Sequence, residues 1–330
     1  MKTKILLTTI VSAFIILPSA LGQGALTPPG APAPTMKTLA QIEPRTAITN
    51  AASAVMITNS GSYYLTGNLT VSSGDAITIA TNGVTLDLNG FTISSTLASA
   101  AGNGILINTG LRNLTILNGF IQGGVTNNGS GVYGGSGFAN GIDYLVNSPV
   151  NVLVSKVSVS GCKFNGIHLG AGDATVVEAC TTRTIGNDGI WASTVKGCGA
   201  ADCGIFAIIG DQVSDCRGAV AGNSGTGIFA YRAAQNCYGY SSGSGPGLNT
   251  VTAQNCYGYS SGGFGISATT AQNCYGSSNS GTGLNVSDVA IGCHGDSNSG
   301  TGLNAFIANS CHGASGSGTP LTTTHNVNSF

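Results

Sequence analysis

Cysteine recurs at an almost constant interval through the second half of this chain. Nine of the ten cysteines form this series, with steps of 18, 18, 18, 21, 19, 18, 19 and 18 residues, and they are Cys162, Cys180, Cys198, Cys216, Cys237, Cys256, Cys274, Cys293 and Cys311. A second series, glycine followed by isoleucine or leucine, has a similar period and comprises Gly166, Gly189, Gly204, Gly227, Gly247, Gly265, Gly283 and Gly302. Two interleaved series of one short period are typical of a stacked repeat. We therefore expect a solenoid in which each repeat forms one coil.

The residues within one repeat indicate β-strands. Ile266 and Ala268 alternate with Ser267, which is the pattern of a strand with one buried face. Eighteen residues rich in Gly, Ser and Asn cannot form two helices, and a leucine-rich repeat has a longer period of about 20–29 residues. A left-handed helix of hexapeptides would need aliphatic residues at steps of six, but the steps from Ile266 reach Gln272 and Ser278. The sequence thus predicts an all-β fold, a right-handed parallel β-helix of roughly twelve three-stranded coils.

The first fifty residues differ in composition from the repeats. Lys2 and Lys4 precede an apolar stretch at 5–17, and small residues follow it, so residues 1–22 are expected to be a secretory signal peptide, with a membrane anchor as the alternative. Residues 23–50 are rich in proline, which favours a stiff linker or stalk. The β-helix domain is predicted over residues 51–325. The mature protein is expected to be secreted or held at the cell surface, without a membrane span.

Charge is scarce in this chain. Only 7% of the residues are charged and the net charge is −1, so no basic surface is available to attract nucleic acid. Apolar residues make up 42% of the chain, which is enough for a buried core. The few ionisable residues concentrate between positions 143 and 217, and residues 227–330 contain only Arg232, Asp288 and Asp296 besides histidines. Any catalytic chemistry is therefore expected on the middle coils.

The repeat resembles that of the pectate-lyase-like superfamily of parallel β-helix proteins. The resemblance rests on residues 74–93, which read GDAITIATNGVTLDLNGFTI, and on the regular Gly-Ile and Cys positions, and it extends over about residues 51–325. It implies the fold, and it implies polysaccharides or cell-surface glycans as partners. The superfamily includes lyases, galacturonases, epimerases, tailspikes and non-catalytic surface proteins, so fold alone does not select an activity. The galacturonase motifs and the clustered acidic calcium ligands of pectate lyases are absent here.

One candidate binding surface follows the first strand of each coil. The residue two positions after each coil-start glycine is expected to face outward, and in successive coils this row includes Asp143, His168, Trp191, Phe206 and Phe229. Aromatic rings aligned about 5 Å apart suit sugar rings, whose C–H surfaces lie against aromatic faces. The alternative is that the long loop at 122–140 or the N-terminal segment covers this row.

A second row follows each cysteine. It reads Tyr238, Tyr257, Tyr275, His294 and His312, and these rings are expected to stack along the outside of the solenoid, with glycan contact as a further role. The asparagines before the cysteines are expected to form turns and an amide ladder. The cysteines themselves are expected to be a buried column of free thiols, with Cys198 and Cys203 as the best candidates for a disulfide. No metal site is predicted.

Two functions of different class remain open. The first is a non-catalytic, secreted glycan-binding or surface-structural protein. The second is a polysaccharide lyase or epimerase for uronic-acid polymers, in which Lys163, His168, Arg183 and Asp188 would supply the base, the acid and the charge neutralisation. No cofactor is expected for the first function, whereas Ca²⁺ is an option for the second. A trimeric adhesin or tailspike is a third, minor alternative.

Overall fold

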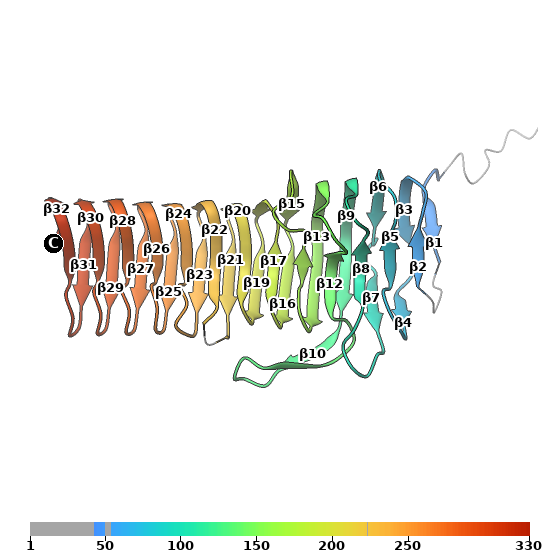
Figure 1. Ribbon diagram of the computed structural model, residues 1–330, viewed down its shortest axis with the longest axis horizontal. Coiled ribbons are helices and arrows are strands. Elements are labelled where there is room, and N and C mark those ends of the chain that lie inside the picture. The colour runs from blue at the N-terminus through green and yellow to red at the C-terminus, as the bar shows by residue number, and fades with distance from the viewer. Residues whose placement is uncertain (1–42, 50–53, 223) are drawn as a thin grey trace, which may run out of the picture. The chain divides into compact units, whose positions relative to one another are not determined.

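The solenoid forms one compact unit. The computed structural model describes residues 43–49, 54–222 and 224–330, and Arg45–Phe330 form the unit that contains all described strands. The predicted signal peptide and most of the predicted linker lie outside the described residues. Within the described residues there is no helix, and hence none that could cross a membrane. The coils follow one another in sequence order (Figure 1).

Three parallel sheets run along the solenoid, and each coil contributes one strand to each. The first sheet contains β2 (Val55–Ile57), β5 (Ile77–Ile79), β8 (Asn103–Ile107), β12 (Asn140–Tyr144), β14 (Ile167–His168), β17 (Asp188–Trp191) and the first parts of β20 (Phe206–Ser214), β22 (Thr226–Gln235), β24 (Leu248–Gln254), β26 (Ile266–Gln272), β28 (Leu284–Ile291), β30 (Leu303–Asn309) and β32 (Leu321–Val327). The second sheet contains β1 (Thr46–Ile48), β3 (Gly61–Leu65), β6 (Val84–Asp87), the first parts of β9 (Arg112–Gln122) and β13 (Val150–Cys162), β15 (Thr175–Glu178), β18 (Thr194–Lys196) and the second parts of β20 to β32.

The third sheet completes each coil. It contains β4 (Leu69–Val71), β7 (Thr92–Ser95), the second parts of β9 and β13, β16 (Thr181–Ile185), β19 (Gly199–Cys203), β21 (Arg217–Val220), β23 (Tyr238–Ser241), β25 (Tyr257–Ser260), β27 (Tyr275–Ser278), β29 (His294–Ser297) and β31 (His312–Ser315). These are twelve strands in the described residues, beside thirteen in the first sheet and fourteen in the second, so the predicted parallel β-solenoid is confirmed and has slightly more turns than the roughly twelve expected. Its right hand stays a prediction. Because β1 pairs with β3, the solenoid includes Thr46–Ile48, which the sequence placed in the linker.

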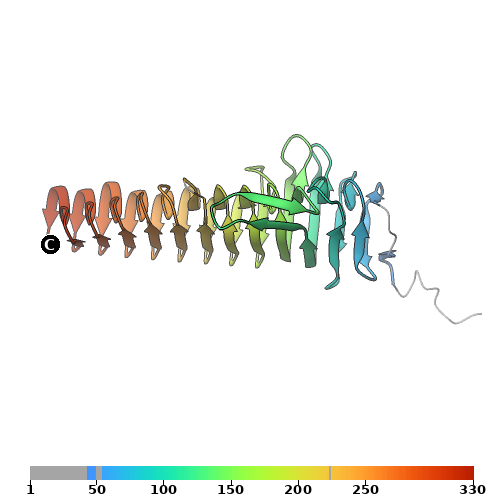
Figure 2. The ribbon, with the colours of Figure 1, turned by 90° about the horizontal axis from the view of Figure 1, so that it is seen from below.

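One hairpin leaves the stack. Strands β10 (Gly124–Asn127) and β11 (Tyr133–Ser136) pair antiparallel and lie alongside the following coils (Figure 2). Tyr133 donates a hydrogen bond to Asp202 at 3.0 Å, and Asn127 donates to the same carboxylate at 2.6 Å. The hairpin is therefore fastened to β19, which lies three coils beyond β9, the strand that precedes the hairpin. The sequence predicted only a long loop here.

A sharp corner joins the second sheet to the third, and it explains the cysteines. The corner residue adopts a left-handed conformation, with φ of 55°, 53° and 52° at Asp215, Asn236 and Asn255. The next residue is a cysteine whose backbone N–H turns inward; the N–H of Cys198 lies 3.3 Å from the Cys216 Sγ of the next coil. The thiol thus accepts a hydrogen bond that the kinked backbone cannot make to a carbonyl. This supports cysteine rather than alanine at the position.

The thiol column begins one coil later than predicted. In the coil that contains β13, Val157 occupies the position that cysteine occupies in later coils. Its N–H lies 3.4 Å from the Sγ of Cys180, which is 23 residues further along the chain. Cys162 lies on the third sheet instead, in a file with Ile185 and Cys203. All ten cysteines are buried and unpaired, so Cys198 and Cys203 form no disulfide. Burial raises the pKa of the Cys162 thiol to about 12, which keeps it protonated at neutral pH.

Candidate functional site on the first sheet

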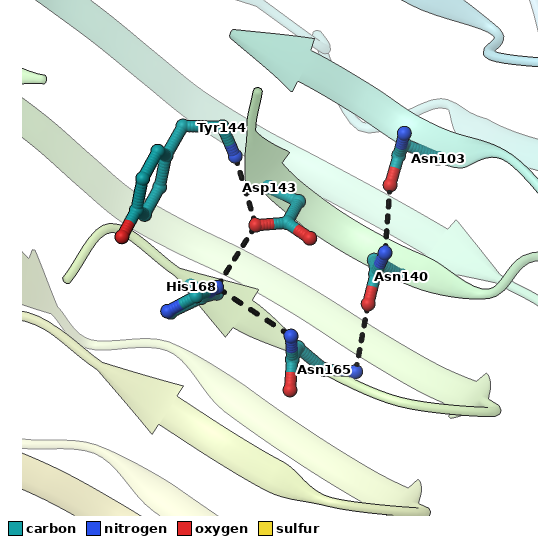
Figure 3. Close-up of polar contacts among 6 residues, drawn as sticks. All are labelled: Asn103, Asn140, Asp143, Tyr144, Asn165 and His168. Atoms are coloured by element: carbon teal, nitrogen blue, oxygen red, sulfur yellow. Dashed lines mark hydrogen bonds and ion pairs between the residues drawn. The ribbon is translucent and has the colours of Figure 1, made fainter. Parts of the chain in front are cut away.

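An aspartate and a histidine pair on the outer face of the first sheet. Asp143 of β12 and His168 of β14 are adjacent in register, and Asp143 Oδ1 lies 2.9 Å from His168 Nδ1 (Figure 3). Because a carboxylate only accepts hydrogen bonds, the neutral imidazole carries its proton on Nδ1 and a lone pair on Nε2. Tyr144 lies beside the pair, and the centroid of its ring is 5.0 Å from the centroid of the His168 ring. The carboxylate thus fixes the orientation of the imidazole.

An amide ladder lies beside this pair, at the start of the same strands. Asn140 donates to Asn103 at 2.9 Å, and the backbone N–H of Asn165 donates to Asn140 at 3.0 Å (Figure 3). Asn103 in turn donates to Asp75 at 2.7 Å. The Asn165 amide lies 3.4 Å from His168 Nδ1, so the ladder reaches the Asp143–His168 pair. The ladder holds the strand starts in register and gives the site one rigid edge.

Trp191 and Asp188 complete the cluster from strand β17. The Trp191 ring packs on the His168 ring at a centroid distance of 4.8 Å. Burial raises the pKa of Asp188, and His168, when it is protonated, opposes that rise. Three polar atoms here are buried without a hydrogen-bond partner among the described residues: His168 Nε2, Asp188 Oδ1 and Trp191 Nε1. Two are acceptors and one is a donor, so a hydroxyl-bearing ligand has the complementary groups. We call Asp143, His168, Asp188 and Trp191 the histidine cluster.

The predicted aromatic row is correct for Trp191 and Phe229 but wrong for Phe206. Ile209, not Phe206, lies between Trp191 and Phe229 in register, and Phe206 pairs with Asp188 instead. The reason is that the coil starts at residues 207–208 rather than at Gly204, three positions later than the sequence pattern indicated. The Phe206 ring still contacts Phe229 edge-on at 5.8 Å. The row is therefore interrupted by an aliphatic residue directly after Trp191.

The four predicted catalytic residues do not form one constellation. His168 and Asp188 belong to the histidine cluster, but Arg183 is exposed on the third sheet, between Ser160 and Ala201 in register. The Lys163 ammonium lies 5.5 Å from the Phe164 ring centroid, at the turn before β14. No contact between either cation and the histidine cluster is present among the described residues. No group of three or more potential metal ligands occurs in that part of the chain either.

The predicted tyrosine row is a continuous stack of rings. Tyr238 and Tyr257 lie 5.0 Å apart and 2° from parallel, and Tyr257 and Tyr275 lie 5.1 Å apart and 7° from parallel. His294 and His312 extend the stack, and the Arg217 guanidinium covers its first ring at 5.0 Å. The ring faces therefore contact one another. A ligand on this side would meet ring edges and hydroxyl groups.

Comparison with known proteins adds little. No family model matches the chain, and no curated protein matches it. Among solved structures, it is similar to a protein of Parabacteroides merdae ATCC 43184 described as a candidate glycosyl hydrolase, with 14% identity over 67% of this chain and 77% of that chain and a TM-score of 0.14. A similarity this low supports no inference about fold or activity.

Proposed function

We propose that this protein is a secreted, non-catalytic glycan-binding solenoid of the pectate-lyase-like type, and that the histidine cluster is its binding site. The observation that carries the proposal is the set of three buried polar atoms without partners on His168, Asp188 and Trp191. Leaving a buried polar group unpaired costs about 1–3 kcal/mol, and each of these atoms exposes less than 1 Å² to solvent. The cluster therefore favours a bound state in which its side chains shift to expose these atoms and a ligand supplies the missing bonds.

A sugar has the chemistry that the cluster lacks. A hydroxyl group donates one hydrogen bond and accepts others, so neighbouring hydroxyls of a sugar match two acceptors and one donor. The half-buried Trp191 ring offers an apolar surface to the C–H face of a pyranose. A purely apolar ligand would leave all three polar atoms unpaired, which disfavours a lipid in this place.

Binding is favoured over lyase or epimerase chemistry because of where the cations lie. Abstraction of a proton next to a uronate requires a positive charge that neutralises the substrate carboxylate beside the base. Arg183 lies on a different sheet from His168, and Lys163 contacts Phe164. The Asp143–His168 pair, at 2.9 Å, still has the geometry of an oriented general base, and that one observation keeps the enzymatic alternative.

Trp191→Ala tests the binding proposal. The mature protein is titrated with soluble plant and bacterial polysaccharides by affinity electrophoresis, and the ligand that binds is then measured by calorimetry. Trp191→Ala is expected to weaken binding at least ten-fold because it removes both the ring face and the Nε1 donor. Phe120→Ala, which removes an exposed ring elsewhere, is the matched control and is expected to bind normally. Wild-type affinity in Trp191→Ala would contradict the proposal.

The enzymatic alternative has its own readout. Lyase action on polygalacturonate or alginate releases unsaturated uronates, which absorb in the ultraviolet, and epimerase action changes the uronate composition seen by proton NMR. Neither signal is expected, with or without Ca²⁺. Turnover that disappears in His168→Ala and persists in Arg183→Ala would replace the non-catalytic proposal with an enzymatic one.

A further inference from the structure

A groove follows the corner between the second and third sheets. The histidine cluster, by contrast, lies on the first sheet. The volume of the groove is about 820 Å³. One wall carries the corner side chains Asp215, Asn236 and Asn255, and the other carries the tyrosine stack that begins at Tyr238. The floor is the backbone at the buried cysteines, so the groove is shaped by the left-handed corner rather than by loops.

Both walls repeat with the spacing of the coils. Asn236 donates to Asp215 at 3.0 Å, and Asn255 donates to Asn236 at 3.3 Å, while the opposite rings recur every 5.0–5.1 Å. A primary amide has two N–H donors and two lone pairs, and the ladder uses one of each at Asn236. Asn236 therefore keeps one donor and one acceptor, and a tyrosine side chain stands opposite each of the three asparagines, whereas Arg217 stands opposite Asp215. Along the three asparagines, the groove thus offers an amide and a tyrosine once per coil.

The charge of the groove excludes most polymers. Its charged lining residues are Asp215 and Arg217, which lie at one end and offset each other. A nucleic acid or a uronic-acid polymer requires a cation for most of its anionic groups, and the groove does not supply them. An extended peptide repeats every 3.3 Å per residue, so its side chains fall out of step with rungs about 5 Å apart. A chain of pyranose rings, by contrast, advances by about one ring per coil.

We infer that this groove is a second binding site, and that it takes a neutral, extended polysaccharide with roughly one sugar per coil. The site does not depend on the histidine cluster, which lies on the first sheet. The rungs end at Gly197 on one side and at Gly292 on the other, where glycine replaces the amide at the same left-handed corner. This wall thus consists of the Asp215 carboxylate and the amides of Asn236, Asn255 and Asn273, which limits the bound segment to about four sugars.

Glycine substitutions give a test that spares the fold. Gly197 and Gly292 already stand at this corner, and glycine adopts the left-handed conformation without strain, so Asn236→Gly with Asn255→Gly removes two rungs and keeps the backbone. Ser310→Gly, at the equivalent corner beyond the groove, is the matched control. The probes are cellohexaose, chitohexaose and mannohexaose, with hexagalacturonate as the acidic comparison, and affinities are measured by calorimetry on the full mature chain.

We expect at least one neutral hexamer to bind, with affinity that rises with chain length up to about four sugars. The double glycine variant is expected to lower that affinity at least ten-fold, and Ser310→Gly and Trp191→Ala to leave this binding unchanged. The inference is overturned by any of three results: no neutral hexamer binds, hexagalacturonate binds more tightly than all of them, or the double glycine variant binds like the wild type. Loss of binding in Trp191→Ala alone would assign the ligand to the histidine cluster instead.

Discussion

The middle coils and the C-terminal coils share one backbone arrangement but differ in how their outward side chains vary from coil to coil. Between Asp143 and Arg217 the coils vary in length and carry most of the charge, and each outward position changes from coil to coil. From Gly227 onward the coils are nearly identical, and equal side chains form continuous files. Variation allows different groups to meet at one place, as in the histidine cluster, whereas repetition extends one surface along the solenoid.

The two regions also differ in how well their polar groups are satisfied. In the C-terminal coils a buried serine anchors each loop; Ser278 donates to Gly263 O at 2.7 Å and accepts from the Gly281 N–H at 2.9 Å. All the partnerless buried side-chain atoms in the described residues lie in the middle coils, on His168, Thr182, Asp188 and Trp191. Regular coils thus maximise stability, and irregular coils tolerate unpaired groups where a ligand can pair with them.

The largest expected effect concerns the packing of the regular coils. A Cβ at Gly258 would collide with the carbonyl oxygen of Gly265 in the next coil, so Gly258→Ala is expected to lower the free energy of unfolding by about 3 kcal/mol. Gly199→Ala, at an outward-facing position of the same sheet, would meet nothing closer than 3.9 Å and serves as the control for an alanine that fits. Urea denaturation of both variants measures the difference. Equal midpoints would show that the coils relieve the collision at Gly258 without a loss of stability.

The thiol column provides the next comparison. Cys198 Sγ accepts the Cys180 N–H at 3.4 Å, so Cys198→Ala strands that amide and is expected to cost about 2 kcal/mol. Cys198→Ser keeps an acceptor and should lose less. Cys162 receives no such bond, because its Sγ lies only near Ser160 O, so Cys162→Ala should be milder. Thermal melts of the three variants rank these effects, and a ranking with Cys162→Ala lowest in stability would contradict the corner role.

The tyrosine stack predicts a smaller effect. Tyr257 stacks on two neighbours, and such pairs contribute about 0.5–1.5 kcal/mol each, so Tyr257→Ala should lower stability by about 1–2 kcal/mol. Tyr257→Phe keeps the ring and is expected to be close to the wild type in chemical denaturation. A large loss in Tyr257→Phe would mean that the hydroxyl, and not ring stacking, stabilises the regular coils.

The smallest effect concerns pH and the middle coils. Burial raises the folded-state pKa of Asp188, so the folded protein binds the proton more tightly than the unfolded chain, and the charged carboxylate destabilises the fold at neutral pH. Asp188→Asn should therefore raise stability slightly at neutral pH and have no such effect at about pH 3, below the usual pKa of aspartate. Melting curves at the two pH values test this. If Asp188 also binds a ligand, the stabilised variant will lose glycan affinity.

The sequence predicted correctly which side chains align from coil to coil wherever the coil length changes little. The tyrosine row, the corner asparagines and the cysteines from Cys180 onward all recur at 18 to 21 residues, so alignment by residue type placed them in register. Cys162 and Phe206 were misplaced because each lies beside a coil of different length. The register there depends on the residue at which the backbone re-enters the sheet. Neither the cysteine series nor the Gly-Ile and Gly-Leu series indicates that residue.

The histidine cluster was predicted only in part. The alternation along the strands placed Asp143, His168 and Trp191 in one row, but it gave no sign that Asp188 would join them. Asp188 lies three residues before Trp191 on β17, and it reaches the cluster because two coils stack side by side. The contact of Tyr133 with Asp202 was likewise hidden, since it joins a hairpin to a strand 69 residues away.

Because the C-terminal coils have nearly the same length and the same residue types at matching positions, they are interchangeable units. Residues 247–264 and 265–282 have the same length and place glycine, leucine or isoleucine, cysteine and tyrosine at the same positions. Excision of 265–282 would leave Leu248 against Leu284, Cys256 against Cys293 and Tyr257 against His294, which are the same kinds of neighbours as before. Unequal recombination between the coding repeats would therefore lengthen or shorten this rod by whole turns and keep the same kinds of neighbours between coils.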